Sequence, residues 1–238
     1  MDELLAKLDE QIAEVENTLD GQSLNNLKQE VSTLTFPLIA DRVKEMEKKL
    51  DEVETAVINQ KKAQVARINS TLQKLNKTKN RNAMESLAKE ISALNDPYFA
   101  EYLETWNKKL LALEEKIFKS ECKKYKYRDL LRDPDIYYGI PVYFKGKVTQ
   151  VDYSGFMVYM RVYVTSKNYR YIKLTTWDDD IYLSYANTDG NNEKYGRYTE
   201  GDIIQIYGVM VGNESYSTVL GGQRTIPAVQ PHYLSRVK

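Results

Sequence analysis

The chain contains one cysteine and one histidine in 238 residues. A single thiol, Cys122, excludes an intramolecular disulfide and any zinc site built from several cysteines. His232 has no second histidine with which to form a metal pair, and a Cys122–His232 dyad would require two distant chain positions to meet. We therefore expect a protein that is not an enzyme, with no cofactor and no metal. Cys122 is expected to be a solvent-near thiol and His232 a solvated surface residue.

Long apolar runs are also missing. No segment approaches the roughly twenty apolar residues of a membrane-spanning helix, and the N-terminus lacks the basic-then-apolar pattern of a secretion signal. The protein is therefore either cytoplasmic or has lost a leader that preceded Met1. Lysines and arginines balance aspartates and glutamates at 34 each. The first half is mildly acidic and the second mildly basic, a split too small to imply polyanion binding by itself.

Aromatic residues are scarce in one half of the chain and dense in the other. Tyr98 and Tyr102 precede Lys119, whereas the other seventeen of the 19 tyrosines lie between Tyr125 and Tyr233. The amino-acid composition changes at the same place, from rich in Leu, Lys and Glu to rich in Tyr, Val and Gly. This change predicts two domains, at residues 1–119 and 120–238.

The first half contains an internal repeat with an offset of sixty residues. Residues 27–54 align with residues 87–114, and the match divides the region into units 1–60 and 61–119. Apolar residues recur at helical spacing, which predicts three helices in each unit. The first helix is expected to end at Gly21, a favoured left-handed cap. A second helix is expected over residues 23–34.

The third helix of each unit is expected to begin at a proline, Pro37 or Pro97, because proline fits the first helical turn. In the second copy Asn95 or Asp96 supplies the N-cap. Between Pro37 and Asn80 the chain has no glycine or proline. The third helix therefore runs on into the next unit as one helix of about 42 residues, roughly 63 Å long at 1.5 Å per residue.

The apolar stripe of this long helix is interpreted as the core of two three-helix bundles that share it. A homodimer through the long helix stays open, because the same spacing suits a coiled coil. Residues 123–126 contain no glycine or proline, so a helical and fairly stiff junction to the second domain is expected.

The repeat resembles a known class of helical sequence. The stretches Ala88–Asp96 and Tyr102–Glu114 are similar to the roughly sixty-residue helical repeats of extracytoplasmic and surface proteins of Gram-positive bacteria. The resemblance implies a spacer and transfers no catalytic residue.

From Tyr125 the pattern is that of strands. One short helix is expected over residues 127–135, where Asp133 and Pro134 stop it. Strands are expected at 142–151, 156–165, 169–175, 181–185, 203–211 and 225–229, with turns at 153–155, 189–192, 200–202 and 221–222. This succession predicts a small closed or partly closed, OB-like β-barrel of five or six strands. The fold class is therefore α + β in separate domains, with Gly146, Gly208 and Gly212 expected at bends or bulges.

Four separated stretches carry a second resemblance. Tyr127–Gly139, Val142–Val151, Gly201–Gly208 and Thr225–Pro227 look like the OB-fold modules of Gram-positive lipoproteins and phage-associated proteins. The resemblance covers residues 125–235. It implies a five-stranded barrel and no reaction. It also favours an extracytoplasmic or cell-envelope location, with the leader missing from this chain, over a cytoplasmic one.

Aromatic and basic residues alternate along the predicted second to fourth strands, where an OB barrel offers a groove for bases or sugars. The candidate ligand residues are Tyr159, Arg161, Tyr169, Tyr171, Lys173, Trp177 and Tyr182. Against nucleic acid, the run Asp178–Asp180 would repel phosphates, and tyrosine is a common strand residue. We therefore predict a helical spacer whose barrel binds a protein or glycan partner. Single-stranded nucleic acid is the alternative partner.

Oxygen-bearing residues also gather in this half. A calcium site could draw on Asp178–Asp180, Asn187, Asp189, Asn191 and Glu193. Gly190, however, breaks the spacing of an EF-hand loop. We interpret these residues as solvated turn residues.

Overall fold

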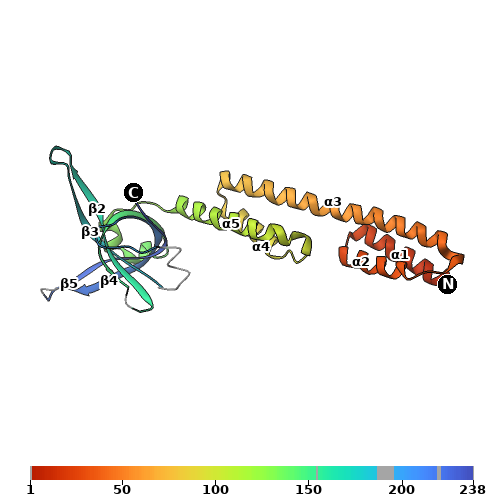
Figure 1. Ribbon diagram of the computed structural model, residues 1–238. Coiled ribbons are helices and arrows are strands. Elements are labelled where there is room, and N and C mark those ends of the chain that lie inside the picture. Colours follow the sequence, from red (N-terminus) through yellow and green to blue (C-terminus); the bar gives the residue numbers. More distant parts are fainter. Residues whose placement is uncertain (1, 154, 187–195, 219–220, 238) are drawn as a thin grey trace. The chain divides into compact units, whose positions relative to one another are not determined.

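The structure is a computed structural model that describes residues 2–153, 155–186, 196–218 and 221–237. The chain forms two compact units (Figure 1). The first unit comprises Met1–Thr78 and Glu85–Asn107, and the second Lys79–Met84 and Lys108–Lys238. The elements are a set of helices followed by a closed five-stranded barrel.

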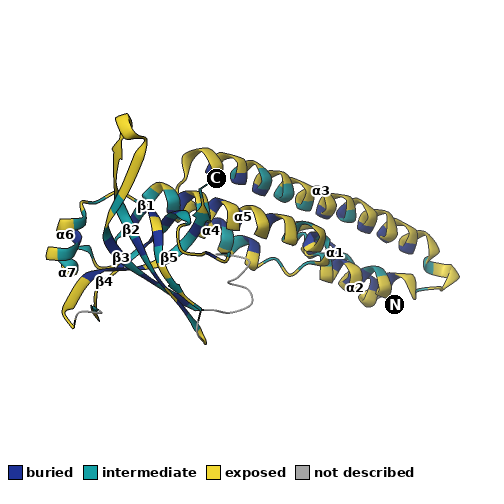
Figure 2. Cartoon of the chain, turned by 60° about the vertical axis from the view of Figure 1, so that its left-hand side comes forward, coloured by how far each residue is buried: buried dark blue, intermediate teal, exposed yellow. Residues whose placement is uncertain are grey.

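The first unit begins with a three-helix bundle. Helices α1 (Asp2–Thr18) and α2 (Gly21–Ser32) pack against the N-terminal half of α3 (Ala40–Thr78) (Figure 1). Each contributes apolar residues at intervals of three and four. Together these residues form one buried cluster that includes Leu8, Ile12, Leu24, Val31, Met46 and Leu50. Figure 2 shows the buried positions of α3 recurring on one side of the helix.

Helix α3 continues into a second bundle, as the sequence predicts. It is 39 residues long, which corresponds to roughly 58 Å. Within the first unit its C-terminal half contacts α4 (Arg81–Ser92) through the ion pair of Arg67 with Glu90, and α5 (Ala100–Glu121) through Trp106. Trp106 Nε1 donates a hydrogen bond of 3.1 Å to Asn69 Oδ1, and Lys61 Nζ lies 2.6 Å from Asp96 Oδ2. The shared long helix and the tandem bundles are therefore confirmed.

The expected helix end at Gly21 is wrong. Helix α1 ends at Thr18, and Leu19 takes the left-handed conformation with a φ of 52°. Asp20 is the N-cap of α2, since its carboxylate accepts from Ser23 N–H at 2.8 Å, so Gly21 opens α2 instead of closing α1. Both third helices begin with a 3-10 turn, Pro37–Ile39 or Pro97–Phe99, and Asp96 caps the second.

The second unit contains the barrel. Its strands are β1 (Pro141–Asp152), β2 (Met157–Tyr169), β3 (Leu174–Ala186), β4 (Ile203–Ser217) and β5 (Gln223–Arg236). They close in the order β1-β2-β3-β5-β4, in which β1 pairs with both β2 and β4 while β3 and β5 run parallel. This is the strand order of an OB fold. Alternate residues point inward to the core, among them Val142, Val158, Met160, Ile181, Leu183 and Ile206.

The barrel glycines lie where strands approach closely or bulge. A Cβ on Gly146 would lie 2.5 Å from Val162 Cγ1, and one on Gly208 would lie 2.4 Å from the Gln230 carbonyl oxygen. The register of β4 against β5 shifts at Gly208 and again before Gly212, whose φ is 109°. Gly208 and Gly212 therefore lie at bulges, as the sequence predicts, whereas Gly146 lies at a close strand contact without a register shift.

The strand expected at residues 169–175 is absent from this described segment. Tyr169 ends β2, Arg170–Ile172 form a 3-10 turn, and Lys173 takes a φ of 49° before β3 begins at Leu174. The segment is the tip of the β2–β3 hairpin, so β2 and β3 are each longer than expected and the barrel has five strands. The expected turn at residues 189–192 lies outside the described residues.

The entry into the barrel also differs from expectation. Helix α5 ends at Glu121, and Lys123 pairs with β1 as an extended residue: Tyr143 N–H donates to the Lys123 carbonyl oxygen at 2.9 Å. The expected helical junction at residues 123–126 is therefore wrong, because the backbone groups of Lys123 pair with β1. The expected single helix is α6 (Tyr127–Arg132), and Pro134 opens a further helix, α7 (Pro134–Tyr137).

Two expectations about solvated residues fail in the same region. The His232 ring stacks on Phe118 with centroids 4.5 Å apart, so the histidine is half-buried against the end of α5. Cys122 is also partly covered, and this burial raises the pKa of its thiol to about 11. Within the described ranges, no helix has the length and apolar character needed to cross a membrane.

Candidate ligand-binding surfaces of the barrel

The predicted ligand residues fall in three separate places on the barrel unit. Tyr159, Arg161 and Tyr182 share a groove with Tyr216, which we call the tyrosine groove. Trp177 lines a different cavity, the lysine pocket, beside Lys124 and Lys145. Tyr169, Tyr171 and Lys173 lie at the hairpin tip, residues 167–174. The structure therefore does not bring all the predicted residues into one site.

The tyrosine groove follows from strand alternation. Val158, Met160 and Val162 of β2 point into the core, so Tyr159 and Arg161 point outward. Tyr182 of β3 pairs with Arg161 across the strands. The end of β1 and the end of β4 complete the walls. The cavity is about 440 Å³ and is lined by Gln150, Asp152, Tyr159, Met160, Arg161, Tyr182, Tyr216, Ser217 and Thr218.

Ring contacts fix the side chains of the groove. The Tyr159 and Tyr182 rings are stacked, with centroids 6.1 Å apart and an angle of 25° between planes. The Arg161 guanidinium lies 4.6 Å from the centroid of the Tyr216 ring. A cation over an aromatic face is attracted by the ring quadrupole, so Arg161 is held against Tyr216.

Tyr216 is fixed from its other end by Asp180. The Tyr216 hydroxyl donates to Asp180 Oδ2 at 3.2 Å, and Arg224 Nη1 lies 3.6 Å from the same oxygen. Asp180 is only 2% exposed. The expectation that Asp178–Asp180 are all solvated turn residues is therefore wrong for Asp180, which is a buried link between β3, β4 and β5.

The tyrosine groove is close to neutral. Its charged lining residues are Asp152 and Arg161, one of each sign. The pKa of Tyr182 is raised by burial and by the nearby charge of Glu214, so its hydroxyl stays protonated at neutral pH. The groove thus offers aromatic faces, phenol hydroxyls, an amide and a carboxylate.

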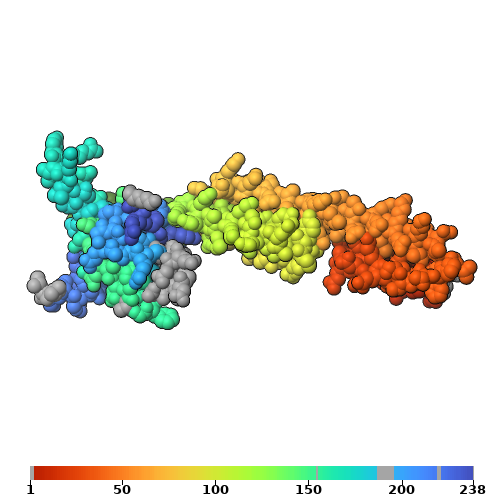
Figure 3. All heavy atoms as spheres, viewed as in Figure 1, coloured from red at the N-terminus to blue at the C-terminus, as the bar shows by residue number. Residues whose placement is uncertain are grey.

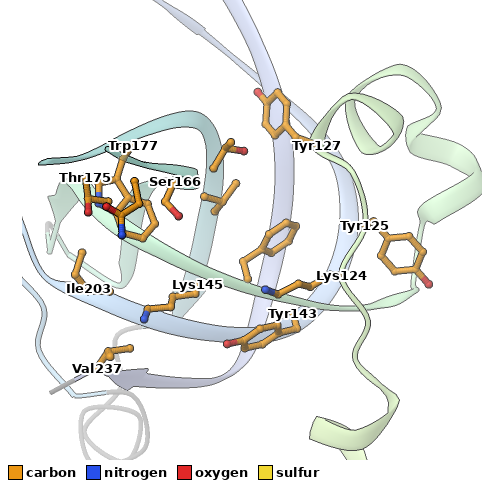
Figure 4. Close-up of a pocket in the computed structure, with 14 residues that line it drawn as sticks. Lys124, Tyr125, Tyr127, Tyr143, Lys145, Ser166, Thr175, Trp177, Ile203 and Val237 are labelled. Carbon is orange, nitrogen blue, oxygen red and sulfur yellow. The ribbon is translucent and has the colours of Figure 1, made fainter. Parts of the chain in front are cut away.

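The lysine pocket is larger, about 730 Å³, and lies beside β1 and the base of the β2–β3 hairpin. Its charged lining residues are Lys124 and Lys145, and within the described ranges neither forms an ion pair. Lys124 Nζ lies 5.4 Å from the centroid of the Tyr143 ring. Figure 4 shows both lysine side chains extending into the space between Tyr143 and Trp177. The pocket therefore combines positive charge with aromatic faces.

The hairpin tip is built from two strands alone. The pairing of β1 with β2 stops at Tyr163, and β5 contacts β3 at Tyr182 and Leu183. Residues from Thr165 to Asp178 pair with one another, and in the described part of the chain no third strand joins them. The hairpin projects from the barrel in the view of Figure 1 and again in Figure 3.

Sequence reasoning missed Tyr216, Lys124 and Tyr143. Tyr216 lies beyond residue 211, where β4 was expected to end. Lys124 lies in the segment that was expected to be helical, so its position beside β1 was not predicted. An aromatic residue on an outward strand position is the signal that marks Tyr143, but this signal also fits many tyrosines that bind nothing.

The described part of the chain contains no candidate metal site. Among those residues no group of three or more His, Cys, Asp or Glu side chains could hold a metal ion. The possible calcium ligands Asn187, Asp189, Asn191 and Glu193 lie outside the described residues.

No protein-family model matches the chain, and a search of curated proteins finds no match. Among solved structures, a small single-stranded DNA-binding protein from Streptomyces coelicolor is 16% identical with a TM-score of 0.30, over 42% of this chain and 94% of that one. OBody AM2EP06 bound to hen egg-white lysozyme is 18% identical with a TM-score of 0.31, over 49% and 94%.

A third similar structure is a putative aspartyl-tRNA synthetase from Leishmania major Friedlin, 12% identical with a TM-score of 0.33, over 54% of this chain and 26% of that one. At these identities and TM-scores the matches assign no function to this chain. The resemblance to lipoprotein and phage-associated modules stays a prediction.

Proposed function

We propose that the protein is a non-enzymatic binding module whose tyrosine groove takes a neutral glycan chain. The observation that carries the proposal is the stacked pair Tyr159 and Tyr182 beside the polar ends of Gln150 and Asp152. Sugar rings pack their C–H faces on aromatic rings, and their hydroxyls pair with carboxylate and amide groups. The outer face of strands two and three is also where OB folds bind oligosaccharides and oligonucleotides.

Charge favours a neutral ligand in this groove. Arg161 is already held by the Tyr216 ring, and Asp152 offsets its charge. Binding of a phosphate chain depends on unpaired basic residues, which release counterions from the polyanion. The tyrosine groove supplies too little positive charge for this, whereas a glycan hydroxyl needs only donors and acceptors.

The test is a calorimetric titration of the full chain with neutral oligosaccharides of chitin, cellulose and mannan. The Tyr159→Ala/Tyr182→Ala variant is expected to lose about tenfold in affinity, because two stacking faces disappear. Tyr138→Ala, which removes an exposed tyrosine outside the groove, is the matched control. Equal affinity of the groove variant and the control would contradict the proposal.

Single-stranded nucleic acid is the second candidate ligand, and the lysine pocket is the observation that favours it. Lys124 and Lys145, which form no ion pair within the described ranges, offer ammonium groups for phosphates, and Trp177 offers a face for a base. This candidate predicts oligothymidine binding that weakens steeply with salt and falls on Lys124→Ala/Lys145→Ala. It also predicts that Tyr159→Ala/Tyr182→Ala leaves oligothymidine affinity unchanged.

The helical region is proposed to act as a spacer, residues 1–119, before a ligand-binding domain, residues 120–238. Its buried residues are apolar members of bundle cores, and its ion pairs are partly or largely exposed. Such pairs adjust stability by small amounts and carry no chemistry. We expect binding of the neutral glycan to need only the barrel domain.

A further inference from the structure

Large apolar side chains gather at the tip of the β2–β3 hairpin. Four of them fall within six residues: Tyr169 is 48% exposed, Tyr171 105%, Ile172 67% and Leu174 48%. Single exposed apolar residues are common on soluble proteins, but a contiguous group marks an interaction surface. Figure 2 colours this end of the hairpin as exposed.

The fold itself leaves these side chains uncovered. Tyr169 pairs with Leu174, and the 3-10 turn of Arg170–Ile172 closes the ribbon. In the described part of the chain no further strand or helix pairs with the ribbon beyond Asp178. An isolated two-stranded ribbon gains little from its own contacts. The described barrel residues therefore leave the tip uncovered.

The charge of the tip has one sign. Lys167, Arg170 and Lys173 lie among the apolar residues, and the sequence has no aspartate or glutamate from Tyr153 to Trp177. Within the described ranges none of these three basic residues forms an ion pair. The acidic run begins only at Asp178, at the base of the ribbon. The tip is therefore both apolar and positively charged.

We infer that the hairpin tip docks on a membrane surface that contains anionic lipid. Tyrosine is enriched at the boundary between headgroups and acyl chains, where its ring is apolar and its hydroxyl stays wet. Ile172 and Leu174 enter the same layer. Lys167, Arg170 and Lys173 contact headgroup phosphates, whose negative surface potential attracts basic residues. This surface is separate from the tyrosine groove and adjoins the lysine pocket, whose lining includes Asn168 and Thr175 of the hairpin.

The shape of the tip favours a bilayer over a protein partner. Tyr171 and Ile172 sit at the turn itself and are exposed by 105% and 67%. The apolar surface is thus a convex end and not a groove. A convex end meets a soft lipid interface without a matching cleft, whereas a protein partner would need an acidic cavity of complementary shape.

The test is co-sedimentation of the full chain with vesicles. One set contains phosphatidylglycerol and phosphatidylcholine in equal amounts, and the other phosphatidylcholine alone. The chain is expected to bind the anionic set and to bind the neutral set at least about tenfold more weakly. Arg170→Gln/Lys173→Gln is expected to weaken binding by about fivefold per removed charge. Tyr171→Ser/Ile172→Ser is expected to abolish it.

Ile136→Ser is the matched control, because Ile136 is 71% exposed and lies in α7, outside the tip. The tip residues are exposed, so their variants keep the fold, which circular dichroism verifies. Binding unchanged by the tip variants, or no binding to either vesicle set, would overturn the inference.

A second measurement reports insertion directly. Tyr171→Trp is expected to give a blue-shifted difference spectrum against the parent chain when anionic vesicles are added, with quenching by brominated acyl chains. Vesicle binding without this shift and quenching would overturn the insertion of the tip.

Discussion

At the scale of single residues, close strand contacts decide which side chains the barrel tolerates. Gly146 and Gly208 both lie where an added Cβ would overlap backbone or core atoms of the neighbouring strand. The sequence alone indicates that these glycines mark bends. It cannot show which residues each one touches, because the neighbours Val162 and Gln230 are set by the register between the paired strands.

Gly208→Ala is expected to destabilise the barrel by about 1–3 kcal/mol, as overpacking does in a closed core. The new Cβ would lie 2.4 Å from the Gln230 carbonyl oxygen and 2.8 Å from Val229 Cγ1. Urea denaturation measures the change. Gly222→Ala is the control, since among the described residues its Cβ would meet only Thr218 Oγ1, at 3.4 Å, and a loss within about 0.5 kcal/mol is expected there. Equal losses would contradict the packing account.

Cys122 is expected to resist alkylation in the folded chain. Burial raises its thiol pKa to about 11, so the thiolate population near pH 8 is at least about a hundredfold lower than for an exposed cysteine. Iodoacetamide labelling at pH 8, with and without urea, measures this difference. Labelling at the same rate in both states would show that the thiol is exposed.

The raised pKa of the Cys122 thiol also makes the stability of the fold depend on pH. The folded-state pKa of Cys122 lies above its ordinary value of 9.0. Its contribution to stability is therefore fully present below about pH 9 and is lost as pH rises towards about 11. Cys122→Ala is expected to reduce the alkaline fall in the thermal midpoint over this window. An identical fall in both chains would remove Cys122 as its cause.

At the scale of elements, helices follow from the sequence more directly than hairpins do. The long helix is visible because its apolar residues recur locally and no glycine or proline interrupts them. Residues 169–175 also read as a strand, rich in tyrosine and isoleucine. They form a turn because a strand needs a partner across the sheet, and partner positions are not local. The position of Lys124 beside β1 was missed for the same reason, because its partner strand is not local in the sequence.

Helix α3 has a middle segment with no buried core residue, held by helical propensity and by partly exposed contacts such as the Lys61–Asp96 ion pair. Between Val57 and Ile68, a stretch described in full, no residue is buried. Lys62→Pro is therefore expected to break the helix between the two bundles, at a cost of about 3 kcal/mol, while Lys62→Ala costs nothing measurable. Circular dichroism and thermal melting of both variants measure this. A proline variant that melts like the alanine variant would show that the segment is not a continuous helix.

At the scale of the whole molecule, the proposed function assigns support to the helices and binding to the barrel. The helical bundles bury their apolar residues between helices. The barrel leaves three surfaces exposed: the neutral tyrosine groove, the lysine pocket and the hairpin tip. The sequence predicted Tyr159, Arg161 and Tyr182 of the groove, Trp177 of the pocket, and Tyr169, Tyr171 and Lys173 of the tip. It could not predict that these residues lie in three places. Their positions depend on how far the β2–β3 hairpin extends beyond the barrel, which the sequence does not show.

The measurement that tests the central claim most directly is a parallel titration of the full chain with neutral oligosaccharides and with oligothymidine, at low and at physiological salt. The account predicts saccharide binding that salt leaves unchanged and that weakens about tenfold in Tyr159→Ala/Tyr182→Ala. Salt-sensitive oligothymidine binding that the groove variant leaves intact, with no saccharide bound, would contradict it.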